Sequence, residues 1–344
     1  MNSDIPTHAR PRLTAGLVTA PPGTKASGEI AVPAAHDEAT TIRVTIVNGA
    51  KNGPLLALVA GNHGYEYAPI LALQRLRARL DPEQMSGAAI LVHVANMPSF
   101  LRRTIYYSPV DGKNLNRVYP GRLDGTVSDR IAYLITKEVI EQADYLIDLH
   151  CGDGNESLRP YSYWDVQGGG SAVVEKARQM ALAFGLERIV LDRERPTDPA
   201  NSIYCSTTAV TRGKPAITIE SGALGMADAE SVARIENGVL SVMRHLHMIP
   251  GEAQAVEHPL FIDHNEVLRS EATGLFYPLI ERGHTCVKGT RLGYITDFFG
   301  TTIYEARATF AGEVLYILGT PPVSKGEPLA MIGHVAEAES PIPR

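Results

Sequence analysis

The chain has 344 residues, 44% of them hydrophobic and 20% charged, which suits one large domain with a sizeable core and a smaller second one. Its formal net charge of −6 excludes the basic surface that nucleic-acid-binding proteins use. No apolar run approaches the roughly 18 residues that span a membrane, and residues 1–13 lack the apolar core of a secretory signal. Three separated cysteines (Cys151, Cys205 and Cys286) favour a reducing compartment, so we expect a cytoplasmic protein without nucleic-acid or membrane partners.

The first hundred residues predict an N-terminal arm followed by alternating strands and a helix. Residues 1–40 are rich in Pro, Gly, Ala and Thr and predict a loose arm. The β-branched stretch 41–48 predicts a strand. The apolar runs Leu55 to Ala60 and Ala88 to Ala95 are typical of buried strands. Between them a helix is expected to begin at Pro69, where the missing N–H costs nothing.

The alternation continues to about residue 247. Residues 107–125 predict a long loop, and long ordered loops in compact domains are often functional. Thr126 is expected to cap a helix that extends to Gln142. The remaining predicted elements are strands at 145–149, 187–191 and 215–219 and helices at 171–184, near 202–211 and at about 227–247. This order indicates an α/β fold, with a mostly parallel or mixed sheet flanked by helices.

The pattern changes near residue 255. Glycines recur from there, and short β-rich segments such as Leu292–Ile295 and Val314–Leu318 lie between them. The Pro250-Gly251 pair breaks the preceding helix. We therefore predict an α/β domain over residues 1–254 and a small, barrel-like, all-β domain over residues 255–344.

Metal-ligand residue types follow two of the predicted buried strands. His63 and Glu66 come just after Ala60, and His150 comes just after Leu149. Ligands bind at the carboxyl ends of strands in a parallel α/β sheet, so we expect these side chains to meet. Two imidazoles and one carboxylate, with a fourth position left for water, form a catalytic zinc set.

A third strand end and one loop supply candidates for the rest of a hydrolytic site. Glu220 follows the strand at 215–219, and partial burial would raise its pKa towards the range of a general base. Asn116 and Arg117 lie in the long loop, where an arginine can grip a substrate carboxylate with two hydrogen bonds. Each residue alone has a commonplace explanation, as a surface charge, a helix cap or a turn. The metal hypothesis depends on two histidines and two glutamates coinciding at strand ends.

Four motifs in the same order resemble those of the aspartoacylase and succinylglutamate desuccinylase family, whose fold is that of the zinc carboxypeptidases. They are Gly61-Asn62-His63-Gly64-Tyr65-Glu66, Asn114-Leu115-Asn116-Arg117 with Tyr119-Pro120-Gly121, Asp148-Leu149-His150, and Thr218-Ile219-Glu220-Ser221-Gly222. The resemblance covers nearly the whole chain. Within the family it points to bacterial deacetylases of N-acetylated diamino acids.

The resemblance implies a role for each matching position. It implies one zinc ion per chain, Glu220 as general base and acid, and a C-terminal module that shapes or covers the active site. The residues it implies are His63, Glu66 and His150 as zinc ligands, Asn116 with Arg117 on the substrate carboxylate, and Arg103 on the oxyanion. The chain has Asn114 where the family often has aspartate, and Tyr106 and Tyr107 disturb the alignment around Arg103.

The predicted function is hydrolysis of the amide bond of a small N-acyl amino acid, with an N-acetyl or N-succinyl group, by water that zinc and Glu220 activate. Three alternatives stay open: a zinc carboxypeptidase acting on peptides, a binding protein with a degenerate site, and a hydrolase that uses Cys151 as nucleophile. The sequence leaves open the acyl group, the amino acid, the choice between zinc and another divalent ion, and a homo-oligomeric state.

Overall fold

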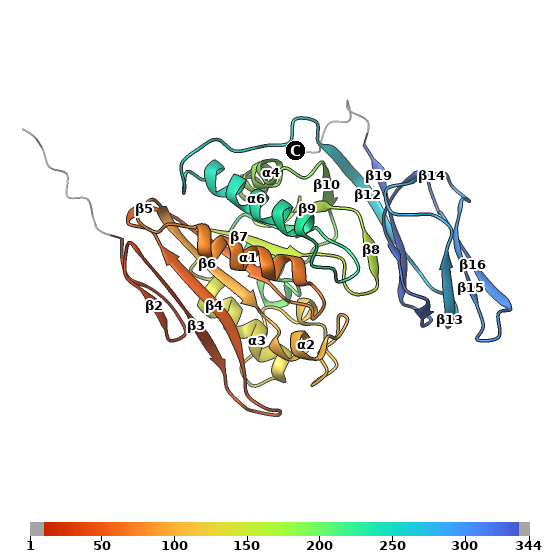
Figure 1. The fold of residues 1–344 in the computed structure, drawn as a ribbon, viewed down its shortest axis with the longest axis horizontal. Helices are drawn as coiled ribbons and strands as arrows, with labels where there is room; N and C mark the ends of the chain where they lie inside the picture. The colour runs from red at the N-terminus through yellow and green to blue at the C-terminus, as the bar shows by residue number, and fades with distance from the viewer. Residues whose placement is uncertain (1–9, 337–344) are drawn as a thin grey trace, which may run out of the picture.

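One mixed sheet of 13 strands passes through both the N-terminal and the C-terminal parts of the chain (Figure 1). The computed structural model describes residues 10–336. The first residues of the predicted arm and the last of the predicted β domain lie outside the described residues. The strand order is β14-β17-β19-β12-β10-β9-β11-β7-β5-β6-β4-β3, and β8 pairs with β17 off this path. The bounds are β3 Thr24–Val32, β4 Thr40–Asn48, β5 Lys51–Ala60, β6 Ser86–Val94, β7 Tyr145–His150, β8 Glu156–Leu158, β9 Tyr161–Asp165, β10 Arg188–Asp192, β11 Ala216–Glu220, β12 Leu260–Arg269, β14 Thr285–Cys286, β17 Gly312–Leu318 and β19 Pro328–Val335.

The centre of this sheet is parallel, as predicted. Strands β6, β5, β7 and β11 run in one direction side by side. The register pairs Ala60 with Leu149 and Glu220 with His150. The carboxyl ends of β5, β7 and β11 therefore meet at one edge of the sheet, where a ligand site is expected.

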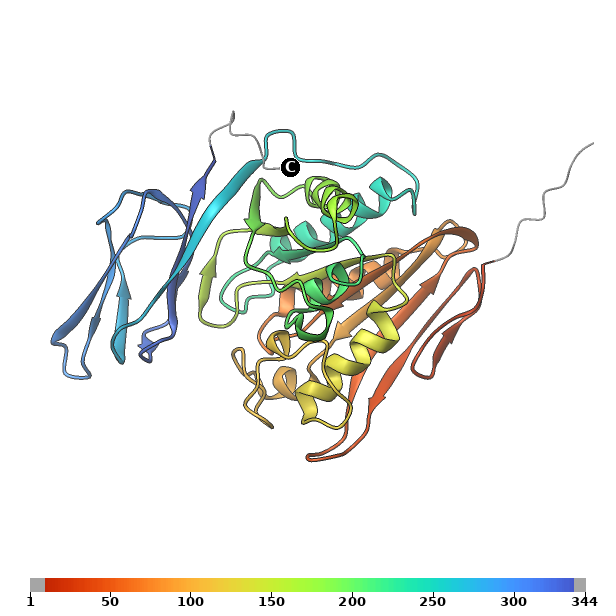
Figure 2. The ribbon, with the colours of Figure 1, turned by 180° about the vertical axis from the view of Figure 1, so that it is seen from behind.

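Helices cover both faces of the sheet. The helices are α1 Tyr67–Arg79, α2 Met97–Arg102, α3 Val127–Ile135, α4 Ser171–Phe184, α5 Cys205–Val210 and α6 Ala229–His245, with short turns η1 Leu115–Arg117, η2 Thr136–Ile140 and η3 Pro199–Asn201. One apolar core joins α1, α4 and α6 to one face, and a second joins α3, η2 and α5 to the other. Figure 2 shows the second face, with α3 in yellow. Leu73 and Ile131 are fully buried in the two cores, and each such side chain contributes about 2 kcal/mol.

The predicted helix at 126–142 is present with one irregularity. Thr126 caps α3 through a capping box with Asp129, which confirms the predicted cap. The helix continues as a π-helical turn, η2, and ends at Ile140.

The C-terminal strands are antiparallel to one another, and the described residues after 255 include no helix, as predicted. A second sheet packs over a separate core. Its strands, in the order β16-β15-β13-β18, are β13 Gly274–Pro278, β15 Arg291–Thr296, β16 Thr302–Arg307 and β18 Pro322–Val323. Strand β12 also pairs in parallel with β10, so the large sheet continues from the α/β part into the C-terminal strands. The boundary at residue 254 stays a prediction.

The prediction of a loose N-terminal arm is wrong over residues 13–32. These residues form β1 (Leu13–Ala15), β2 (Val18–Ala20) and β3, which pairs antiparallel with β4 along its whole length. Ile30 and Val32 are buried on the core side, and the alternate side chains of Ser27, Glu29 and Ala31 are exposed. The strand alternates with a period of two, but its high content of small and polar residues hid that alternation. Within residues 10–336, every helix is too short or too polar to cross a bilayer.

Candidate active site

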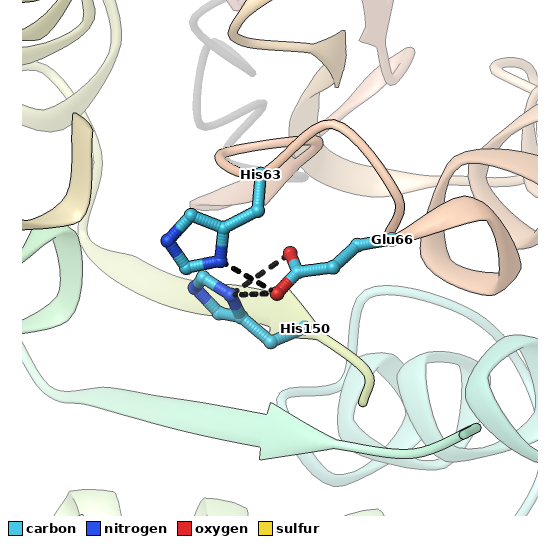
Figure 3. A group of neighbouring side chains, drawn as sticks. All are labelled: His63, Glu66 and His150. Carbon is cyan, nitrogen blue, oxygen red and sulfur yellow. Dashed lines mark hydrogen bonds and ion pairs between the residues drawn. The ribbon is translucent and has the colours of Figure 1, made fainter. Parts of the chain in front are cut away.

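Three buried side chains converge at the carboxyl edge of the sheet (Figure 3). Strand β5 ends at Ala60, and the chain then turns through Gly61 in the left-handed region (φ +73°), which favours glycine. The turn brings in His63, and Glu66 stands at the N-cap of α1. His150 is the last residue of β7. Glu66 Oε1 lies 2.7 Å from His63 Nδ1 and 3.0 Å from His150 Nδ1.

Polar contacts at the outer nitrogens orient both imidazole rings. His63 Nε2 lies 3.0 Å from Asn114 Oδ1, and His150 Nε2 lies 3.0 Å from Asp148 Oδ1. Metal ligation through Nδ1 would place the ring protons on Nε2, facing Asn114 Oδ1 and Asp148 Oδ1; His150 Nε2 also lies 3.1 Å from the Asn116 amide nitrogen. The Nδ1 lone pairs then face Glu66, which is the orientation that metal ligation needs. Asp148 is fully buried, and its carboxylate contacts His150 directly.

The electrostatics of this cluster favour a cation at its centre. Burial alone would raise the pKa of Glu66, but the charges of His150 and His63 lower it to about 2. Burial likewise opposes protonation of the two histidines. The charge of Glu66 nevertheless raises the pKa of His63, and the charges of Asp148 and Glu66 raise the pKa of His150. Glu66 Oε2 is buried and makes no hydrogen bond to a described residue, although it lies 3.0 Å from His150 Nδ1. The donor atoms lie within 4.8 Å of one another, so the set fits a divalent ion.

Replacing Asp148 with asparagine is expected to weaken metal binding by roughly 10–100-fold, the usual cost of losing a partner of a ligating histidine. Asparagine keeps the shape but removes the charge that faces His150 Nε2. Competition with a chromogenic chelator measures the affinity. Asp144→Asn is the matched control, because Asp144 directly precedes the same strand and accepts a hydrogen bond from the Leu55 backbone. Equal affinity in the Asp148 and Asp144 variants would contradict this role.

A cavity of about 800 Å³ connects this cluster with the third predicted strand end. Glu220 ends β11, is partly exposed to the cavity, and makes no hydrogen bond to a described side chain. Burial raises the pKa of Glu220 well above its usual range, Glu66 adds to this shift, and His150 opposes it. The structure therefore brings His63, Glu66, His150 and Glu220 to one cavity.

The two residues predicted for the substrate carboxylate line the same cavity and differ in their contacts. Asn116 is buried, accepts a hydrogen bond from the Cys205 backbone (2.8 Å) and lies 3.4 Å from Asp148 Oδ2 through its amide nitrogen. Arg117 uses one terminal nitrogen for the backbone carbonyl of Asn116 (2.7 Å) and has no carboxylate partner among the described residues. Of the two side chains, Arg117 has more nitrogen donors without a partner among the described residues.

Arg103 is the one predicted site residue that the structure does not bring to the cavity. It is exposed, caps the C-terminus of α2 with a left-handed φ of 52°, and is absent from the cavity lining. Tyr106, three residues later, lines the cavity instead. Its ring packs edge-on at 6.0 Å from His63, and its hydroxyl donates to Asn155 and Glu156.

Several cavity residues were not among those expected from the sequence. Arg195 and Tyr204 come from the segment after β10, and the C-terminal strands and loops supply Val267, Arg269, Tyr316, Lys325 and Met331. The run Arg193-Glu194-Arg195 directly after a predicted strand was the available clue for Arg195. The C-terminal contribution agrees with a module that shapes the site.

The alternative nucleophile, Cys151, is buried beside Glu66 and Glu220. Burial and these carboxylates raise its thiol pKa well above the ordinary value, so the reactive thiolate is disfavoured. All three cysteines are free and buried.

This fold and site define an α/β protein with a candidate metal centre at the carboxyl edge of its sheet and an acidic residue in the same cavity. Residues 52–246 match the succinylglutamate desuccinylase/aspartoacylase catalytic domain. The chain belongs to this family.

One named relative and several solved structures are similar to this chain over most of their length. The chain is 32% identical to the N-alpha-acetyl-L-2,4-diaminobutyric acid deacetylase of Halomonas elongata, over 90% of this chain and 92% of the relative. The product-bound ectoine utilization protein EutE (DoeB) of Ruegeria pomeroyi superposes with a TM-score of 0.82 at 28% identity, covering 92% and 98% of the two chains. A succinylglutamate desuccinylase from Silicibacter sp. superposes with a TM-score of 0.81 at 26% identity, covering 93% of this chain and 98% of that one.

Proposed function

We propose that this protein is a zinc-dependent deacylase that hydrolyses the amide bond of a small N-acyl amino acid. Membership of the family supports a hydrolase of this general kind. The observation that carries the proposal is the buried group of His63, Glu66 and His150, which shares one cavity with Glu220.

The relative from Halomonas elongata, by its name, removes an acetyl group from Nα-acetyl-2,4-diaminobutyrate. We infer an N-acetylated diamino acid as the first substrate to test here. The identity of 32% over 90% of the chain supports this choice, and an N-succinyl amino acid is the second.

The proposed roles of the chain's own groups follow from their positions. Zinc, when bound, would lower the pKa of water and polarise the acyl carbonyl. Glu220 would accept a proton from the attacking water and pass it to the leaving amine, and its raised pKa suits both transfers. Arg117, with Asn116 beside it, would bind the substrate carboxylate.

The first test combines metal analysis with a substrate panel. We expect about one zinc ion per chain, released by a chelator together with the activity, and hydrolysis of Nα-acetyl-L-2,4-diaminobutyrate in preference to matched dipeptides. Amine release gives the rate. A preference for dipeptides would support the carboxypeptidase alternative. Purified protein that neither contains nor gains metal would support a binding protein.

A further inference from the structure

Two guanidinium groups stand over one tyrosine ring in the wall of the cavity. The Cζ atom of Arg195 lies 3.9 Å from the ring centroid of Tyr204, and that of Arg117 lies 4.6 Å from the same centroid. Arg195 is also within 5.4 Å of the Tyr163 ring centroid. All four residues line the cavity that contains the His–Glu–His group and Glu220.

The contacts of Arg195 hold the side chain in place and leave its outer donors available. Its Nε donates to Asp192 in an ion pair, and its side chain is 13% exposed. Neither terminal nitrogen donates to any residue that the structure describes. The stack on Tyr204 and the bond to Asp192 therefore orient a planar pair of N–H donors, which matches the two oxygens of a carboxylate.

The charges of this wall do not balance. Asp192 offsets one of the two positive charges. Arg117, whose one hydrogen bond goes to a backbone carbonyl, has no carboxylate partner among residues 10–336. Two cations beside one ring repel each other in a partly desolvated cavity unless an anion joins them. The wall thus lacks one negative charge, which a substrate carboxylate would supply.

We propose that Arg195 joins Arg117 in binding the α-carboxylate of the substrate. This inference rests on the proposed deacylase function and adds to it one specificity-determining residue. N-acylated diamines, which have the same amide but no carboxylate, would be poor substrates, because they leave the extra positive charge unpaired. Arg195 acts in this scheme as a binding residue and takes no part in proton transfer.

The test uses the zinc-loaded enzyme and two substrates that differ in one group, Nα-acetyl-L-2,4-diaminobutyrate and N-acetyl-1,3-diaminopropane. In Arg195→Gln, KM for the first is expected to rise roughly 10–100-fold, the usual effect of losing a hydrogen bond to a charged group. The kcat should change much less, and kcat/KM for the diamine should stay as in the wild type. Arg195→Lys keeps the charge without the planar pair of donors, so its KM should lie between those of the wild type and Arg195→Gln.

Arg193→Gln is the matched control, because Arg193 carries the same charge two residues away and lines only a neighbouring hollow, outside the cavity that contains the His–Glu–His group. Calorimetry with free L-2,4-diaminobutyrate, the deacylated product, measures carboxylate binding without turnover. An equal loss on both substrates in Arg195→Gln, or product binding unchanged from the wild type, would overturn the role of Arg195. A wild-type enzyme that hydrolyses neither substrate would instead overturn the proposed function.

Discussion

Replacing His150 with alanine is expected to remove the bound metal and to lower kcat/KM by roughly 10³-fold or more. Loss of a cation that stabilises developing charge removes several kcal/mol of transition-state stabilisation, and each 1.36 kcal/mol is about tenfold in rate. The imidazole is buried, and its Nδ1 faces Glu66 Oε1 at 3.0 Å. Metal content by emission spectrometry, together with amine release from the N-acetyl substrate, measures both effects.

His334→Ala is the control for this variant. His334 also pairs with a carboxylate, that of Asp263 at 2.7 Å, but its side chain is 47% exposed on the C-terminal strands, and it does not line the cavity. Metal content and rate should stay at the wild-type level in this control. A His150 variant that is folded, retains a full equivalent of zinc and turns over normally would contradict the assignment of the ligand set.

The local part of the site could be predicted from sequence because the fold class determines it. Buried parallel strands place their carboxyl ends at one edge, so His63, His150 and Glu220, each at or just beyond such an end, were expected to meet. The register of β7 with β5 and β11 brings them together. The ring orientations could not be foreseen, because they depend on Asn114, from a loop, and on whether Asp148 faces His150.

The rest of the cavity depends on pairings between distant segments. Strand β12 joins β10 more than 60 residues after it in the chain, and β8 joins β17 more than 150 residues later. No local pattern encodes these contacts, so the contribution of the C-terminal strands to the cavity could be expected only from the family resemblance. The error over residues 13–32 has a different origin. Small and polar side chains make up the exposed face of β3, so the sequence pattern did not indicate an edge strand whose other face is buried.

The sequence also does not determine which arginine reaches the cavity. Arg103 and Arg195 both lie near the end of a helix or strand. Arg103 is exposed at the left-handed C-terminus of α2, whereas Arg195 stacks on Tyr204 in the cavity. A sequence pattern does not contain this information. The oxyanion role that the resemblance implies for Arg103 has no support from its position, and Tyr106 occupies the cavity wall beside His63.

Replacing Glu220 with glutamine is expected to leave the metal in place and to lower kcat by about 10²–10⁴-fold, the range that a positioned general acid–base contributes. Glutamine preserves the shape at the end of β11 but can neither accept the proton of the attacking water nor deliver it to the amine. In the wild type, kcat/KM should fall as pH decreases through the pKa of this carboxyl, because the protonated form is no base. Burial raises that pKa, so the loss should begin at a higher pH than for an ordinary glutamate, although a bound cation shifts it back.

The variant and its control separate proton transfer from general electrostatics. Glu327→Gln removes a carboxylate that lines the same cavity from the loop before β19, and it should change kcat less than tenfold. Glu220→Gln should lose the acidic limb of the profile together with the rate, while zinc content and the affinity for the deacylated product persist. If kcat and the acidic limb both survive in Glu220→Gln, the proton acceptor is another group. Since burial raises the pKa of Asp153 to about 7, that buried carboxyl near Glu66 and His63 would be the next candidate.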